Sequence, residues 1–261
     1  MDSISADSGE ELSSAYQALP KVFSPYKFEV QQLNSNNISL QAQIDEDFQQ
    51  STEKCVKLLG LTWDRMSDEI FTRPIKLDGN ACTKRTILKS IASQFDIYNF
   101  NLPLLNRSRM FMHTLQCDKD LEWDKKLKPE LQREWKNICK QANSAPEIKV
   151  PRFVGSRKST YKLLAYTDAS RGHYGAVVYI LEVATGKISF VLAKNRLVNI
   201  QFKLKSIQSL ELNAINLGVE ILLEIYRDLS GPGCLSPIRI EELLLFTDSI
   251  CYLYWLNSFF Q

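Results

Sequence analysis

The chain has 261 residues and a formal net charge of +2, with 44% hydrophobic and 24% charged residues, an ordinary globular balance that suits one large or two modest domains. No apolar run approaches the ~20 residues of a membrane span, and the first residues lack the basic and apolar regions of a signal peptide. Because there are two histidines and the six cysteines lack C-x-x-C spacing, we expect no zinc site and reduced thiols in an intracellular protein.

The N-terminal stretch is acid-rich, and its patterns predict five elements. Helical spacing, strand alternation and polar turns indicate a helix at Asp7 to Phe23, a strand at Lys27 to Leu33, a loop at Asp45 to Thr52, a strand at Cys55 to Asp64 and its hairpin partner at Glu69 to Arg73.

The middle of the chain is helical and basic. Apolar residues at helical spacing predict three helices, at Thr83 to Phe95, Leu104 to Cys117 and Pro129 to Asn143, and a linker with two prolines comes next at Ser144 to Ser159. Lysine and arginine are concentrated between Lys119 and Lys158. Such a basic stretch is better evidence for a polyanionic partner than the small net charge of the whole chain. A face of lysines that tracks a nucleic-acid duplex is one interpretation, and a solvated surface is the other.

From Tyr161 the pattern changes to a mixed α/β sheet. Apolar and β-branched runs predict three strands, a long helix, a fourth strand and a final helix, at Tyr161 to Thr167, Gly175 to Glu182, Lys187 to Ala193, Ile207 to Asp228, Ile238 to Thr247 and Ile250 to Phe260.

Two aspartates come directly after strands of this predicted sheet. Asp168 ends the first strand and Asp248 ends the fourth. Functional residues collect at the carboxyl ends of strands in α/β sheets. Taken alone, however, Asp168 could be a turn residue that binds its own backbone, and Asp248 or Ser249 could cap the following helix.

Glu211 is harder to explain as a surface residue. It shares one helical face with Ile215, Gly218 and Leu222, so its carboxylate projects from an apolar stripe. A carboxylate there must be paired, protonated or bound to a metal. If it meets Asp168 and Asp248, oxygen ligands without histidine favour Mg²⁺ or Mn²⁺, and the matching chemistry is two-metal phosphodiester hydrolysis.

The same residues resemble a known family. Four motifs are similar to the ribonuclease H region of Bel/Pao-type LTR retrotransposon Pol polyproteins: Tyr-Thr-Asp-Ala-Ser-Arg-Gly-His-Tyr-Gly-Ala-Val-Val-Tyr (166–179), Ala-Lys-Asn-Arg (193–196), Leu-Glu-Leu-Asn-Ala (210–214) and Phe-Thr-Asp-Ser (246–249). Upstream, Leu-Leu-Gly-Leu-Thr-Trp-Asp (58–64) and Thr-Lys-Arg-Thr-Ile-Leu-Lys-Ser-Ile-Ala-Ser-Gln-Phe-Asp (83–96) resemble the segment between reverse transcriptase and ribonuclease H. The resemblance implies the tail of a reverse transcriptase palm at 1–78, a helical thumb or connection at 79–150 and a ribonuclease H-like domain at 160–261.

The resemblance also implies an activity and a site. The expected activity is hydrolysis of RNA in RNA–DNA hybrids, with Asp168, Glu211 and Asp248 as catalytic metal ligands and the rest of the Pol polyprotein as a partner. The implied nucleic-acid contacts are Lys194, Arg196, Ser170 and Ser249. For Lys194 and Arg196, phosphate contact and a solvated strand end are both open.

Three functions remain as alternatives. The family's polymerase motif, Tyr-x-Asp-Asp, is not found in this sequence, and the first residues resemble the family's sequence just downstream of that motif. A fourth ribonuclease H carboxylate on a later helix is expected beyond Gln261. An active ribonuclease H module therefore competes with a catalytically inactive nucleic-acid-binding or structural relic. An ATPase of the actin type is the third alternative, although the turn at Asp168 to Gly172 makes a poor phosphate loop.

Overall fold

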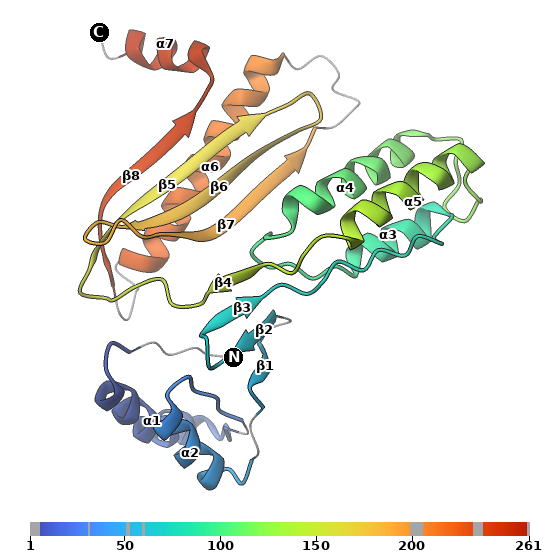
Figure 1. The fold of residues 1–261 in the computed structure, drawn as a ribbon. Coiled ribbons are helices and arrows are strands. Elements are labelled where there is room, and N and C mark those ends of the chain that lie inside the picture. Colours follow the sequence, from blue (N-terminus) through green and yellow to red (C-terminus); the bar gives the residue numbers. More distant parts are fainter. Residues whose placement is uncertain are drawn as a thin grey trace. The chain divides into compact units, whose positions relative to one another are not determined.

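The computed structural model of the chain describes residues 6–30, 32–50, 53–58, 61–198, 206–231 and 237–259. Two compact units can be distinguished, one formed by Met1–Phe71 with Lys149–Arg157 and the other by Thr72–Ile148 with Lys158–Gln261. Figure 1 shows the elements of both in sequence colours.

The first unit joins short helices to a small antiparallel sheet. Helices α1 (Gly9–Phe23) and α2 (Ile38–Asp47) flank the 3-10 helix η1 (Ser24–Tyr26). The sheet has the order β1-β2-β3-β4, from Cys55–Leu58, Leu61–Asp64, Glu69–Phe71 and Lys149–Pro151. The predicted first helix is confirmed, and the Ser8 hydroxyl caps it by accepting the N–H of Glu11.

Three predictions in this unit were wrong. No strand forms in the described part of 27–33, because Lys27 takes a left-handed φ of 57° and turns the chain while Phe28 stays exposed. The loop expected at 45–52 begins as the end of α2, where Leu40 and Ile44 bury an apolar face. The strand expected at Cys55 to Asp64 is two strands, β1 and β2, which pair antiparallel. Residues 31, 51–52 and 59–60, which fall within the three predicted segments, lie outside the described ranges.

The expected linker also contains structure. Strand β4 pairs antiparallel with β3. Next to it, the Arg152 guanidinium donates two hydrogen bonds to the Asp68 carboxylate, at 2.7 and 3.0 Å, and lies over the Trp63 ring. This bidentate pair fastens the β4 segment to the turn between β2 and β3.

Three helices of the second unit share one core. They are α3 (Lys84–Ala92), α4 (Leu102–Cys117) and α5 (Pro129–Asn143), and all three predicted helices are confirmed. Trp135 is fully buried at their centre, stacks on Phe111 and donates its indole N–H to the Asp78 carbonyl at 2.9 Å. Thr83 forms a capping box at the start of α3.

The second unit also contains the mixed sheet. Its order is β7-β6-β5-β8, from Ile188–Leu197, His173–Glu182, Thr160–Ala169 and Arg239–Thr247. Strands β5, β6 and β7 are antiparallel neighbours, and β8 runs parallel to β5. Helix α6 (Ile207–Ser230) packs on β5, β6 and β8, and α7 (Ile250–Phe259) comes after β8 (Figure 1). The predicted mixed α/β fold is confirmed.

The helical segment contacts the outer strand of this sheet. The Asn195 amide of β7 donates to Asn106 of α4 at 2.8 Å, and the Phe100 and Phe190 rings lie 4.8 Å apart. Within the described ranges, none of the helices combines the length and apolarity that crossing a membrane requires. The described cysteines are free thiols, and Cys234 lies outside those ranges.

Candidate metal centre

The two aspartates lie at one edge of the sheet. Asp168 is near the end of β5, and Asp248 comes directly after the last residue of β8. The parallel register pairs Thr167 with Thr247, so each strand delivers its aspartate at the same level. The Thr167 hydroxyl also donates to the Phe246 carbonyl at 3.2 Å and ties the two strands together just before the acids. Sequence reasoning missed this buried threonine, whose role depends on the pairing of two strands far apart in the chain.

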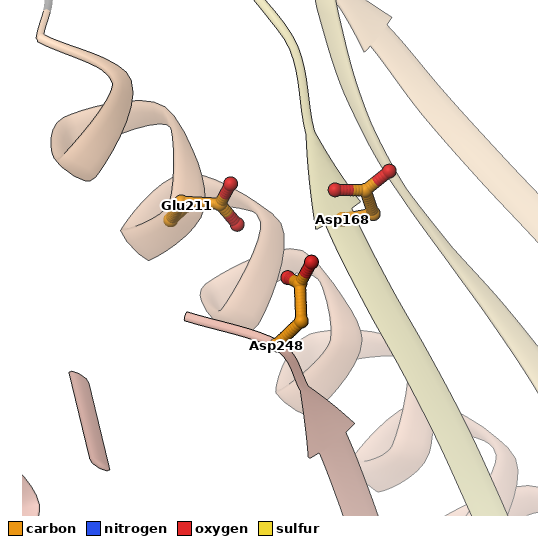
Figure 2. Close-up of side chains that lie close together, drawn as sticks. All are labelled: Asp168, Glu211 and Asp248. Atoms are coloured by element: carbon orange, nitrogen blue, oxygen red, sulfur yellow. The ribbon is translucent and has the colours of Figure 1, made fainter. Parts of the chain in front are cut away.

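Helix α6 brings the third acid to the same edge. Ser206 caps the helix by accepting the N–H of Ser209, and Glu211 lies in its second turn. Carboxylate oxygens of Asp168, Glu211 and Asp248 all lie within 4.8 Å of one another. Figure 2 shows the three side chains pointing toward a common space between the helix and the strand ends. The convergence on which the sequence hypothesis depended is therefore present.

The surroundings of Glu211 disfavour its charged form. Among the residues that the structure describes, the Glu211 Oε2 atom is buried and has no hydrogen-bond partner. Burial raises the pKa of Glu211, and the neighbouring charges of Asp168 and Asp248 raise it further. Three carboxylates that offer oxygen ligands, one of them with an unsatisfied oxygen, match the preference of Mg²⁺ and Mn²⁺, so the residues present fit a divalent cation.

The alternative role of Asp168 as a turn residue is also partly realised. Its Oδ1 atom accepts the N–H of Ala169 at 2.7 Å. One hydrogen bond leaves acceptor capacity on the carboxylate, which has two oxygens. A local turn contact and a ligand role are therefore compatible.

A model of one protein family matches most of the chain. It is described as the Pao retrotransposon-like RNaseH-like domain and matches residues 83–249, which include helices α3 to α5 and the mixed sheet. The chain belongs to this family. No curated protein matches the sequence.

Solved structures with a similar chain course include two foamy viral proteins. One is the foamy viral protease-reverse transcriptase dRH in complex with double-stranded DNA, at a TM-score of 0.49 and 11% identity over 97% of this chain and 39% of that one. The other is the foamy viral protease-reverse transcriptase in complex with an RNA/DNA hybrid, at a TM-score of 0.49 and 12% identity over 94% of this chain and 36% of that one. This Pao-family chain thus spans well under half the length of either structure.

The predicted nucleic-acid contacts of the Pao-family chain lie on different elements. Lys194 and Arg196 of β7 form ion pairs with acids of α6, Lys194 with Glu224 at 2.8 Å and Arg196 with Glu220 at 3.8 Å. The Lys194 side chain is partly exposed and the other three are largely exposed, so these pairs contribute little to stability and are open to competition from other anions. Each of these pairs joins residues 24 to 30 positions apart in sequence, so the pairing depends on how α6 packs against the sheet.

The two predicted serines differ in their surroundings. The Ser170 hydroxyl lies 3.0 Å from His173 Nδ1 in the turn after β5, and the Ser170 N–H donates to the His173 carbonyl. The backbone N–H of Ser249 donates to the Thr247 hydroxyl at 3.2 Å. Both serines flank the acidic cluster in sequence, and their contact with nucleic acid remains a prediction.

The raised pKa of Glu211 predicts how stability depends on pH without metal. Between the ordinary value of 4.5 and the raised folded value, the folded chain keeps a proton that the unfolded chain releases. Glu211 therefore lowers the free energy of unfolding as pH rises through this window, after which its effect is constant. In chelator, we expect Glu211→Gln to be more stable than the wild type at pH 7, and the difference to shrink toward pH 4. Urea unfolding at several pH values measures this, and a constant difference would contradict it.

Proposed function

We propose that this chain is the ribonuclease H module of a Pao-type retroelement Pol protein and hydrolyses RNA in RNA–DNA hybrids. The observation that carries the proposal is the Glu211 Oε2 atom, which is buried and has no hydrogen-bond partner among the described residues, beside two aspartates with oxygens within 4.8 Å. A carboxylate in that position is costly unless a cation compensates it. Family membership supplies the reaction class, because the family description names both the retrotransposon and the ribonuclease H-like domain.

Asp168, Glu211 and Asp248 would hold two Mg²⁺ or Mn²⁺ ions. Such a pair, when bound, activates a water molecule and stabilises the leaving oxygen of a phosphodiester. The chain itself supplies the placement of the three ligands. Strands β5 and β8 fix the two aspartates, and helix α6 holds Glu211 against them. Rigid placement on sheet and helix keeps the carboxylates from being reorganised when substrate binds.

The proposed substrate contacts are Lys194, Arg196, Ser170 and Ser249, and the remaining partner is the rest of the Pol polyprotein inside the cell. Lys194 and Arg196 form exposed ion pairs with Glu224 and Glu220, and these pairs can exchange for phosphates. A duplex that displaces these carboxylates would gain two charge-assisted contacts.

One observation favours a second candidate, a nucleic-acid-binding relic without cleavage. Within the described residues the cluster holds three carboxylates, and the family resemblance implies a fourth. Such a protein would keep the fold and the hybrid contacts but lack an acid needed for turnover.

Cleavage of defined duplexes tests both candidates. The purified chain is incubated with Mg²⁺ and an RNA–DNA hybrid labelled on the RNA strand, with double-stranded DNA and double-stranded RNA as controls. We expect cleavage of the RNA strand in the hybrid alone, abolished by chelator. A folded chain that binds the hybrid with steep salt dependence but leaves it intact would support the relic, and a chain that does neither would exclude both.

We predict that the Lys194→Ala, Arg196→Ala double variant binds the hybrid about tenfold more weakly and lowers the slope of log Kd against log salt by about two, because two phosphate contacts are lost. Glu224→Gln should act in the opposite direction, since it frees the Lys194 ammonium. Fluorescence anisotropy at several salt concentrations measures both effects. Lys187→Ala, an exposed lysine before β7, is the matched control, and an equal effect there would argue against a specific contact.

A further inference from the structure

Helix α6 lies close against the sheet at Gly218. This residue is buried, and a Cβ atom added there would stand 2.5 Å from Thr167 Cγ2 and 3.2 Å from Leu245 Cδ1. The first distance is far shorter than any ordinary contact between carbon atoms. The helix can therefore lie at this height over β5 and β8 only because residue 218 has no side chain.

The sheet cannot give way at this point. Thr167 is 6% exposed, and its hydroxyl is engaged with the Phe246 carbonyl at 3.2 Å. Rotation of its side chain to move the methyl aside would break that hydrogen bond and leave a buried hydroxyl unpaired. A side chain at position 218 must therefore push α6 away from the sheet.

The contact touches all three elements that carry the acids. Thr167 directly precedes Asp168 on β5, and Leu245 lies three residues before Asp248 on β8. Gly218 comes seven residues after Glu211, which places both on one face of α6 and about 10 Å apart along its axis. The height of the helix at Gly218 thus sets the distance from Glu211 to both aspartates.

We propose that Gly218 is a positioning residue for the acidic cluster: the absence of its side chain lets α6 seat against Thr167, so that Glu211 reaches Asp168 and Asp248. The use of metal binding as a test rests on the proposed function, whereas the contact between α6 and the sheet does not depend on it. If this is so, removing the Thr167 methyl group from the sheet should compensate for the methyl group that Gly218→Ala adds to the helix. Thr167→Ser does this and keeps the hydroxyl that bonds Phe246.

The test is a double-mutant cycle of Gly218→Ala and Thr167→Ser with Mn²⁺ binding as the readout. Isothermal titration calorimetry is done below the melting temperature of every variant. We expect Gly218→Ala to weaken Mn²⁺ binding by about tenfold or more, the size of effect typical when a supporting residue of a metal site is changed. Adding Thr167→Ser should restore most of the affinity relative to Thr167→Ser alone.

Gly79→Ala is the matched control, because its added Cβ would lie 3.8 Å from Cys139 Cβ, an ordinary contact. It should leave Mn²⁺ binding unchanged. Wild-type affinity in folded Gly218→Ala, or no rescue in the double variant, would overturn the inference. If the wild type binds no Mn²⁺, the proposed function fails instead, and crystal structures of the wild type and Gly218→Ala decide the positioning. A Glu211 carboxyl in the same place in both structures would overturn the inference, and a carboxyl displaced from both aspartates in Gly218→Ala would support it.

Discussion

Glu211→Gln should reduce Mg²⁺-dependent cleavage of an RNA–DNA hybrid by about 10³-fold, which corresponds to the loss of roughly 4 kcal/mol of transition-state stabilisation. Glutamine keeps the size of the side chain and can still accept a hydrogen bond, but it lacks the charge that holds a divalent cation. The variant thus separates loss of the ligand from loss of packing. Single-turnover cleavage at saturating enzyme measures the chemical step without the contribution of binding.

The control for this prediction is Asp228→Asn, which neutralises an exposed acid on the same helix. It should cleave like the wild type, because its charge lies far along α6 from the cluster. Neutralising Asp168 or Asp248 should resemble Glu211→Gln, since all three oxygens meet in one space (Figure 2). Wild-type cleavage by Glu211→Gln would remove Glu211 from the proposed ligand set.

Trp135→Ala should lower the free energy of unfolding by about 3–5 kcal/mol, the range found when a large aromatic core residue is truncated. Trp135 is fully buried, stacks on Phe111 and donates to the Asp78 carbonyl, so truncation leaves both a cavity and an unpaired carbonyl. Urea unfolding followed by circular dichroism measures the loss.

Trp123→Ala is the matched control for the tryptophan prediction. Trp123 is 43% exposed, and we expect its truncation to cost well under the value for Trp135. Equal losses for the two variants would contradict the assignment of Trp135 as the centre of the helical core.

Elements with strong local patterns were predictable, and those that depend on a partner were not. Helices α3 to α6 each carry an apolar face at helical spacing, and their predicted ranges agree closely with the structure. By contrast, the alternation at 27–33 predicted a strand, and none forms in the described part of this segment. An alternating segment becomes a strand only when a neighbouring strand pairs with it. Strand β4 was missed for the opposite reason, since three residues in a proline-containing segment become a strand only by pairing with β3.

The sequence by itself determined which residues are candidates for the site. Two aspartates placed after apolar strands and a glutamate within an apolar helical stripe are local patterns, and the helix and strand periods suffice to identify them. Their resemblance to the Pao-type ribonuclease H region also depends only on short motifs, and the family match agrees with it.

Only the tertiary structure decided how these residues meet. The parallel register of β5 and β8 levels Asp168 with Asp248, and the missing side chain at Gly218 lets α6 bring Glu211 to them. The pairing of Lys194 with Glu224 likewise arises from a contact between distant segments, as does the burial of Glu211 Oε2, which has no hydrogen-bond partner among the described residues. The periodicity of a sequence shows on which face of a helix or strand a residue lies. The distance between a helix and a sheet is set by packing, which depends on side chains from the whole unit.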